Sequence, residues 1–181
     1  HAPAPKPRVM AGTPIAPAAL QATDGAYTDR VEVTWSGVGG ADGYQVLRAT
    51  SSVPSQAAVL ANVGPVTRYD DTGVPAGTVH WYWVKATNVA GASGLSPSND
   101  GYRAETRTLA VNSAHGAAVP PAGANAFALG APVNAWIADS PVTAGSTQYV
   151  CSGGTVAGHA FTPVNPTNVT LPLTNNAALD W

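Results

Sequence analysis

Few side chains in this sequence carry groups that could take part in catalysis or hold a metal ion. Glycoside hydrolysis needs two carboxylates that face one cleft, but the only glutamates, Glu32 and Glu105, are expected at solvent-facing positions. Asp70 and Asp71 are adjacent, which favours capping of a turn over an acid–base pair. The sequence contains no H-E-x-x-H, G-x-S-x-G, P-loop or EF-hand pattern. We therefore expect no enzymatic activity, no metal site and no cofactor.

The single cysteine, Cys151, excludes a disulfide within the chain and a metal site built from cysteines. A lone cysteine is usually buried, and we expect that state here, with a bridge to another chain as the alternative. The sequence begins at His1 rather than at a methionine, so we expect a processed product or an excised fragment.

Charge is scarce and unevenly distributed along the chain. Charged residues make up 10% of the 181 residues and the net charge is −2, which excludes a basic footprint for nucleic acid or anionic membranes. No segment approaches the roughly 18 apolar residues that span a bilayer. Sixteen of the charged residues precede Thr108, and only Asp139 and Asp180 follow it. Because soluble domains normally carry interspersed charge, the second half is either solubilised by neutral polar groups or covered by neighbours.

The elements that must position these residues are short strands. Apolar residues alternate with a period of two around 31–35, 44–46, 80–86 and 109–111, which is typical of strands with one buried face. Turn clusters rich in Gly, Pro, Asn and Asp separate the runs. The pattern predicts an all-β protein with a sandwich-like architecture. We expect an extended Pro/Ala-rich arm over 1–16, a β-sandwich over 17–104 and a small β-domain over 105–181.

The segments VEVTWSGVGGADGYQVLR, TRYDDTGVPAG and WVKATNVAGASGLSPS carry a resemblance that spans about residues 17–103. They are similar to a fibronectin type III domain, a β-sandwich of two sheets. The resemblance and the alternation together imply a shared core between the sheets, for which we predict five residues: Trp35, Tyr44, Val46, Tyr82 and Val84. The family usually places a corner tyrosine where this sequence has His80, which we expect to be hydrogen-bonded within the fold.

The same alternation places Trp81, Trp83 and Lys85 on the outer face of their strand. Two indoles on one face form an amphipathic platform, and an exposed aromatic patch usually marks an interface. Three interpretations remain open. The platform is covered by the arm or the second domain, it contacts another protein chain, or it stacks against sugar rings.

Residues 107–181 carry a second resemblance through three patterns: L-x-V-x-S-x-x-G from Leu109, P-x-x-G from Pro120 and F-x-x-G-x-x-V from Phe127. They resemble the divergent InlB-type B-repeats of bacterial surface proteins. Those repeats commonly carry a Trp a few residues after the aromatic of the central strand, whereas this chain continues Val-Cys-Ser-Gly-Gly after Tyr149. Both resemblances imply stalk, adhesive or assembly roles in secreted proteins rather than catalysis.

These observations predict a non-enzymatic structural subunit of a secreted bacterial filament or surface assembly. Its main partner would be other copies of itself. The arm of one copy would add to a sheet edge of the next, where Val9, Met10, Ile15 and Leu20 would fill pockets. Trp81 and Trp83 are further candidates for contacts between copies. The alternative is an accessory module of an adhesin or polysaccharide-degrading enzyme that binds a glycan or a cell-surface protein.

Overall fold

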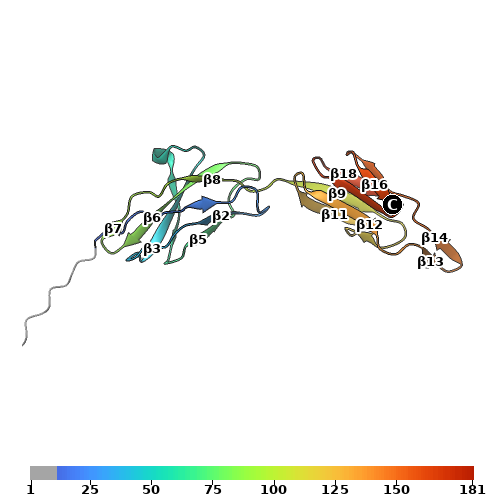
Figure 1. Cartoon of the computed structure of the whole chain (residues 1–181), viewed down its shortest axis with the longest axis horizontal. Helices are drawn as coiled ribbons and strands as arrows, with labels where there is room; N and C mark the ends of the chain where they lie inside the picture. Colours follow the sequence, from blue (N-terminus) through green and yellow to red (C-terminus); the bar gives the residue numbers. More distant parts are fainter. Residues whose placement is uncertain (1–11) are drawn as a thin grey trace, which may run out of the picture. The chain divides into compact units, whose positions relative to one another are not determined.

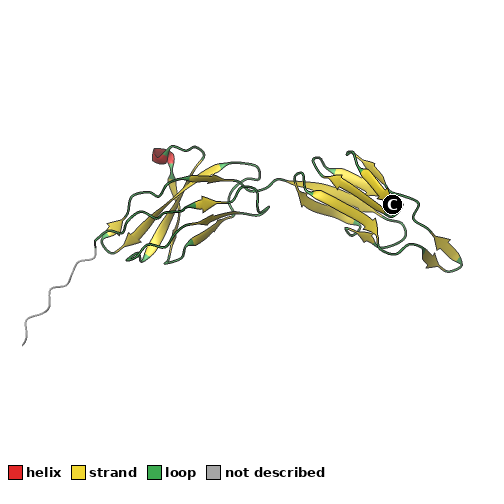
Figure 2. Ribbon diagram, in the orientation of Figure 1, coloured by secondary structure: helices red, strands yellow, loops and turns green. Residues whose placement is uncertain are grey.

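The computed structural model describes residues 12–181, which form strands joined by turns and loops, with a single 3₁₀ turn, η1, at Pro54–Gln56 (Figure 2). The chain divides into two compact units, His1–Ala104 and Glu105–Trp181. The predicted all-β class is therefore confirmed. Within the described part of the chain, no helix has the length and apolar character that a membrane crossing requires.

The first unit is a sandwich of two antiparallel sheets (Figure 1). One sheet has the order β1-β2-β5, and its strands are β1 (Gln21–Ala22), β2 (Val31–Thr34) and β5 (Arg68–Asp71). The other has the order β4-β3-β6-β7, with β8 also paired to β6. Its strands are β3 (Gly43–Ala49), β4 (Ala58–Val63), β6 (His80–Asn88), β7 (Gly91–Ala92) and β8 (Asn99–Gly101).

The core of the first unit lies between these two sheets. Alternating residues of β2, β3 and β6 point inward, as the period-two pattern requires. The five residues singled out from the sequence all lie in this core: Trp35, Tyr44, Val46, Tyr82 and Val84. The rings of the first two meet at a centroid distance of 5.4 Å, tilted by 60°, a favourable geometry for aromatic pairs. His80 is buried, and its Nδ1 lies 3.2 Å from the carbonyl oxygen of Thr78.

The second unit is also a sandwich of two sheets. One has the order β11-β9-β18-β15, formed by β9 (Thr106–Asn112), β11 (Gly123–Ala128), β15 (Thr155–Ala157) and β18 (Ala177–Asp180). The other has the order β10-β12-β17-β16, formed by β10 (Ala118–Val119), β12 (Pro132–Ile137), β16 (Thr162–Asn165) and β17 (Asn168–Pro172). A hairpin of β13 (Val142–Ala144) and β14 (Thr147–Tyr149) completes the unit.

The two ends of the second unit's chain segment meet in the middle of one sheet. The first strand, β9, pairs in parallel with the last, β18, so that Leu109 lies opposite Ala177 and Val111 opposite Leu179. These residues join those of β12 and β17 in one apolar core. The pairing ties residues about 70 positions apart, which makes the second unit dependent on its C-terminal strand.

Candidate interaction surface

The outer face of β3 and β6 does not present the expected pair of exposed indoles. Trp83 is only 2% exposed, and it packs with Leu47 and Ala49 of the neighbouring strand in a small separate cluster. Trp81 is half-buried at the edge of that cluster. The expectation that both indoles form an exposed platform is therefore wrong. Neither the glycan-stacking nor the protein-contact interpretation of Trp83 is compatible with this burial.

The cover over Trp83 comes from the first unit itself, through Leu95 and Ala57. The segment around Leu95 is bound to β6 through Ser93 and Ser96, which form both backbone and side-chain hydrogen bonds with that strand. The backbone N–H groups of Ser93 and Ser96 donate to the carbonyls of Ala86 and Val84 at 2.8 and 2.9 Å. Their hydroxyls accept the N–H groups of the same two β6 residues, both at 2.9 Å. The spacing S-x-x-S around a leucine was the signal in the sequence that could have predicted this cover.

Residues 12–20, which include the end of the predicted arm, are anchored to their own domain. Asn88 Nδ2 donates to the carbonyl of Gly12 at 2.8 Å, and Ser36 N donates to that of Ala18 at 2.9 Å. Leu20 is 5% exposed and belongs to the first unit's core, so its predicted role as a contact residue for another copy is wrong.

Of the other three apolar residues predicted on the arm, Ile15 alone lies in the described part of the chain. Ile15 is 76% exposed and is therefore free to contact a partner. Val9 and Met10 lie outside the described residues.

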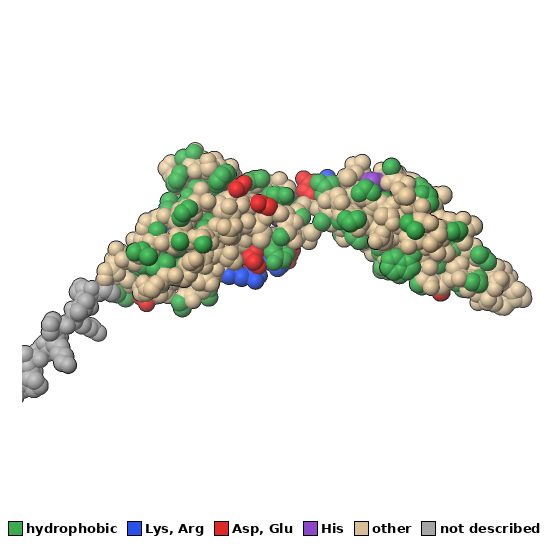
Figure 3. Space-filling model, viewed as in Figure 1, with side chains coloured by type: hydrophobic (Ala, Val, Ile, Leu, Met, Phe, Trp, Pro, Cys, Tyr) green, Lys and Arg blue, Asp and Glu red, His purple; other side chains and the backbone are tan. Residues whose placement is uncertain are grey.

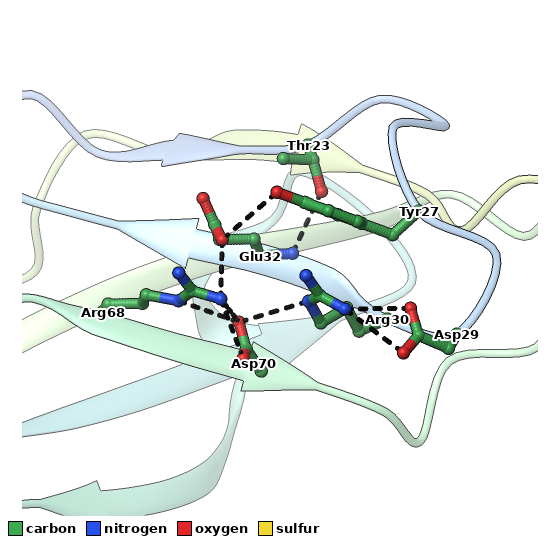
Figure 4. A network of polar contacts seen from close by, with 7 residues as sticks. All are labelled: Thr23, Tyr27, Asp29, Arg30, Glu32, Arg68 and Asp70. Atoms are coloured by element: carbon green, nitrogen blue, oxygen red, sulfur yellow. Dashed lines mark hydrogen bonds and ion pairs between the residues drawn. The ribbon is translucent and has the colours of Figure 1, made fainter.

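A network of charged side chains covers the outer face of β2 and β5 (Figure 4). Arg68 Nη2 lies 2.8 Å from Glu32 Oε2 and 3.0 Å from Asp70 Oδ2. The hydrogen bond to Asp70 and the two nearby carboxylates raise the pKa of Arg68. Arg30 Nε lies 3.7 Å from Asp70 Oδ1, and the same guanidinium sits 3.7 Å above the Tyr27 ring. Because β5 is the edge of its sheet, this network places charge where another strand would have to add.

A cavity of about 240 Å³ opens in the second unit beside the β13–β14 hairpin. Its walls include His115 and Tyr149, whose rings stack at a centroid distance of 3.5 Å. Two of the other polar side chains in its walls, Ser140 and Asp139, accept hydrogen bonds from the chain's own backbone. Ser140 Oγ accepts the N–H of Cys151 at 3.0 Å, and Asp139 accepts the N–H of Ala117. The arrangement thus serves to hold the surrounding loops.

Cys151 lines this cavity as a half-buried free thiol rather than the fully buried one expected from the sequence. Its Sγ lies 3.1 Å from the carbonyl oxygen of Pro166, to which it donates. Among the residues that the structure describes, no group of three or more His, Cys, Asp or Glu side chains is placed to hold a metal ion.

The second unit's surface is almost without free charge, and Figure 3 shows few acidic or basic side chains on it. Of its last 74 residues only Asp139 and Asp180 are charged, and both accept hydrogen bonds from the unit's own groups. Asn112 Nδ2 donates to Asp180 Oδ1 at 2.7 Å, and Asp139 accepts the bond from Ala117 described above.

At the edge of one sheet, β11 pairs with β9 on one side only. This uncharged edge is the candidate interaction surface of the chain.

Comparisons with solved structures return fibronectin type III-like domains that cover about half of the chain. A Fn3-like protein from Clostridium thermocellum is 28% identical, with 52% of this chain and 97% of that one covered and a TM-score of 0.46. The sixth fibronectin type III domain of a human protein is 18% identical, with coverages of 52% and 91% and a TM-score of 0.42. Pectate lyase PelI from Erwinia chrysanthemi is 19% identical, with coverages of 49% and 27% and a TM-score of 0.39.

No protein-family model matches the chain, and no curated protein sequence matches it. The resemblance of residues 107–181 to InlB-type B-repeats stays a prediction, because none of these comparisons bears on it. The strand pairings establish an all-β chain whose first unit is a sandwich of two sheets.

Proposed function

We propose that the chain is a non-enzymatic structural subunit of a secreted bacterial filament or surface assembly. Copies would associate through contacts between their β-domains and through the N-terminal arm. The observation that carries this proposal is the second unit's surface, whose two carboxylates after Thr108 are both engaged within the unit. A surface without free charge tends to associate with others of its kind, and a subunit packed between copies has no need of charge there.

The arm would supply the second kind of contact. Gly12 and Ala18 are hydrogen-bonded to the first unit and Leu20 lies in its core, so we assign the contact with a neighbour to residues 1–11 and the exposed Ile15. Pro3, Pro5 and Pro7 alternate with residues that keep their N–H groups. A strand added at a sheet edge uses the N–H groups of every second residue, so prolines at alternating positions are compatible with such an addition.

The burial of Trp83 argues against the alternative, an accessory module that binds glycans through Trp81 and Trp83. A sugar ring stacks on an accessible indole face, but Trp83 is covered by Leu95 and Ala57. The pectate lyase among the structural neighbours shares a fold with about half of this chain, and a shared fold does not transfer a ligand.

Negative-stain electron microscopy tests the proposal with the purified chain and a variant that lacks residues 1–11. The deletion stops before Gly12 so that the hydrogen bond to Asn88 is kept. Filaments or sheets from the full chain that disappear in the deletion variant would support both kinds of contact. Assemblies from both proteins would support the subunit role without the arm. Dispersed monomers from both would overturn the proposal.

A further inference from the structure

The edge strand β11 offers an open row of backbone groups along its whole length. It pairs with β9 residue for residue, from Gly123 opposite Val111 to Ala128 opposite Thr106, with no shift in register. Among the residues that the structure describes, no other strand lies on its far side. In a regular antiparallel strand, the N–H and C=O groups of every second residue point away from the existing partner. Those groups on β11 are therefore available to a further strand.

The other long edges described for this chain carry features that discourage strand addition. β5 carries the charge network around Arg68 and Asp70, and β4 pairs with β3 through a β-bulge between Val46 and Leu47. β16 contains Pro163 and a register shift. The remaining edge strands are only two or three residues long: β1, β7, β8, β10, β13, β14 and β15. By contrast, β11 has six residues without charge, proline or bulge.

The side chains of β11 favour a second copy of the same strand as its occupant. Ala124 and Ala126 lie opposite Ala110 and Thr108 on the outer face, and both are exposed. A two-fold contact places each strand against its own sequence, so a charge on this short strand would lie near the like charge of the other copy. No charged residue occurs between Arg107 and Asp139. Two copies of this uncharged strand can therefore pair without electrostatic repulsion between them.

The N-terminal arm fits the β11 edge less well than a second copy does. The arm carries Lys6 and Arg8, and β11 with its flanking turns offers no carboxylate to either cation. We propose that β11 of one copy pairs antiparallel with β11 of a second copy, which joins two four-stranded sheets into one continuous sheet. This inference rests on the proposed function, because it names the β-domain contact through which copies associate.

A matched pair of lysine variants tests the assignment in the full chain. Ala126→Lys places a charge on the outer face at the β11 edge, and Ala157→Lys places one at the opposite edge of the same sheet, where Ala157 is also exposed. Sedimentation velocity measures association, and circular dichroism checks that each variant keeps its fold. We expect A126K to associate at least about tenfold more weakly than the wild type, because like charges meet across the interface, and A157K to associate as the wild type does.

Hydrogen exchange of the wild type supplies a measurement that needs no substitution. Amides of residues 123–128 should exchange more slowly at high than at low protein concentration, and the same protection should appear in the variant lacking residues 1–11. Protection that vanishes with this deletion would assign the edge to the arm and overturn the two-fold pairing. Association that is equal in A126K and the wild type, or equally weak in A126K and A157K, would overturn the β11 assignment while the subunit role stands. A monomeric wild type at every concentration would overturn both.

Discussion

The hydroxyl of Tyr82 donates a hydrogen bond to the carboxylate of Asp71 at 3.0 Å in the interior of the first unit. Arg48 Nη1 donates to the same carboxylate oxygen at 2.7 Å, and the backbone N–H of Gly73 donates to the other oxygen at 3.0 Å. Asp71 ends β5 in one sheet, whereas Tyr82 and Arg48 belong to β6 and β3 in the other. The 2% exposed carboxylate therefore fastens the two sheets to each other.

Replacing Asp71 with asparagine should destabilise the first unit. The substitution keeps the shape of the side chain but leaves Arg48 without its counter-charge, and breaking a buried ion pair costs about 3 kcal/mol. Urea unfolding followed by tryptophan fluorescence measures the change in the free energy of unfolding. Asp70→Asn is the matched control, because this neighbouring carboxylate is exposed and its loss should have little effect. Equal midpoints for the two variants would contradict the role given to Asp71.

Alkaline pH should weaken the fold through Tyr82. Burial, followed by the Asp71 carboxylate, raises the pKa of the Tyr82 hydroxyl above its ordinary value. Above about pH 10, the unfolded chain loses a proton that the folded chain keeps, so this group lowers the free energy of unfolding by about 1.4 kcal/mol per pH unit.

The variant Tyr82→Phe removes this group and tests its pH dependence. It should be less stable than the wild type near neutral pH by about 1 kcal/mol, the net value of one hydrogen bond. It should also lose stability less steeply between about pH 9 and 11. Parallel slopes for Tyr82→Phe and the wild type would show that the hydroxyl ionises freely in the folded protein.

The two outer-face tryptophans should differ in their contribution to stability. Trp83 is enclosed by Leu47, Ala49 and Leu95, so Trp83→Ala should cost about 3–5 kcal/mol through lost burial and a cavity. Trp81 is half-buried, and Trp81→Ala should cost clearly less. Chemical unfolding of both variants measures the difference. If Trp83→Ala were tolerated without loss of stability, the cover by Leu95 would not be the dominant state in solution.

Removing the charges from β5 should affect solubility more than stability. Arg68 and Asp70 form exposed ion pairs, which contribute little to folding, but they protect an edge strand against further pairing. The double variant with threonine at both positions should keep its urea midpoint and show more turbidity on concentration. Serine substitutions at the exposed positions Thr106 and Thr108 of the central strand β9 provide a control that changes no edge. Unchanged turbidity in the β5 variant would contradict the protective role.

The strands and the core of the first unit could be predicted from the sequence, because a period of two in apolar residues reports directly on which side chains share a face. Trp35, Tyr44 and Val84 were placed between the sheets on that ground, and they lie there. The scarcity of charge after Thr108 was equally visible. The period does not indicate which other residues pack over the outer face of a strand.

Tertiary structure decided the properties of the surfaces. Alternation put Trp83 on the outer face, but the serine-held segment around Leu95 then covered that face. The edge position of β11 follows from the parallel pairing of β9 with β18, a contact between residues far apart along the chain. A strand's own sequence determines its two faces, whereas its neighbours are chosen by long-range pairing that closes the core. The sequence by itself therefore determined the faces and the charge of this protein, and only the fold decided which edges and side chains remain accessible.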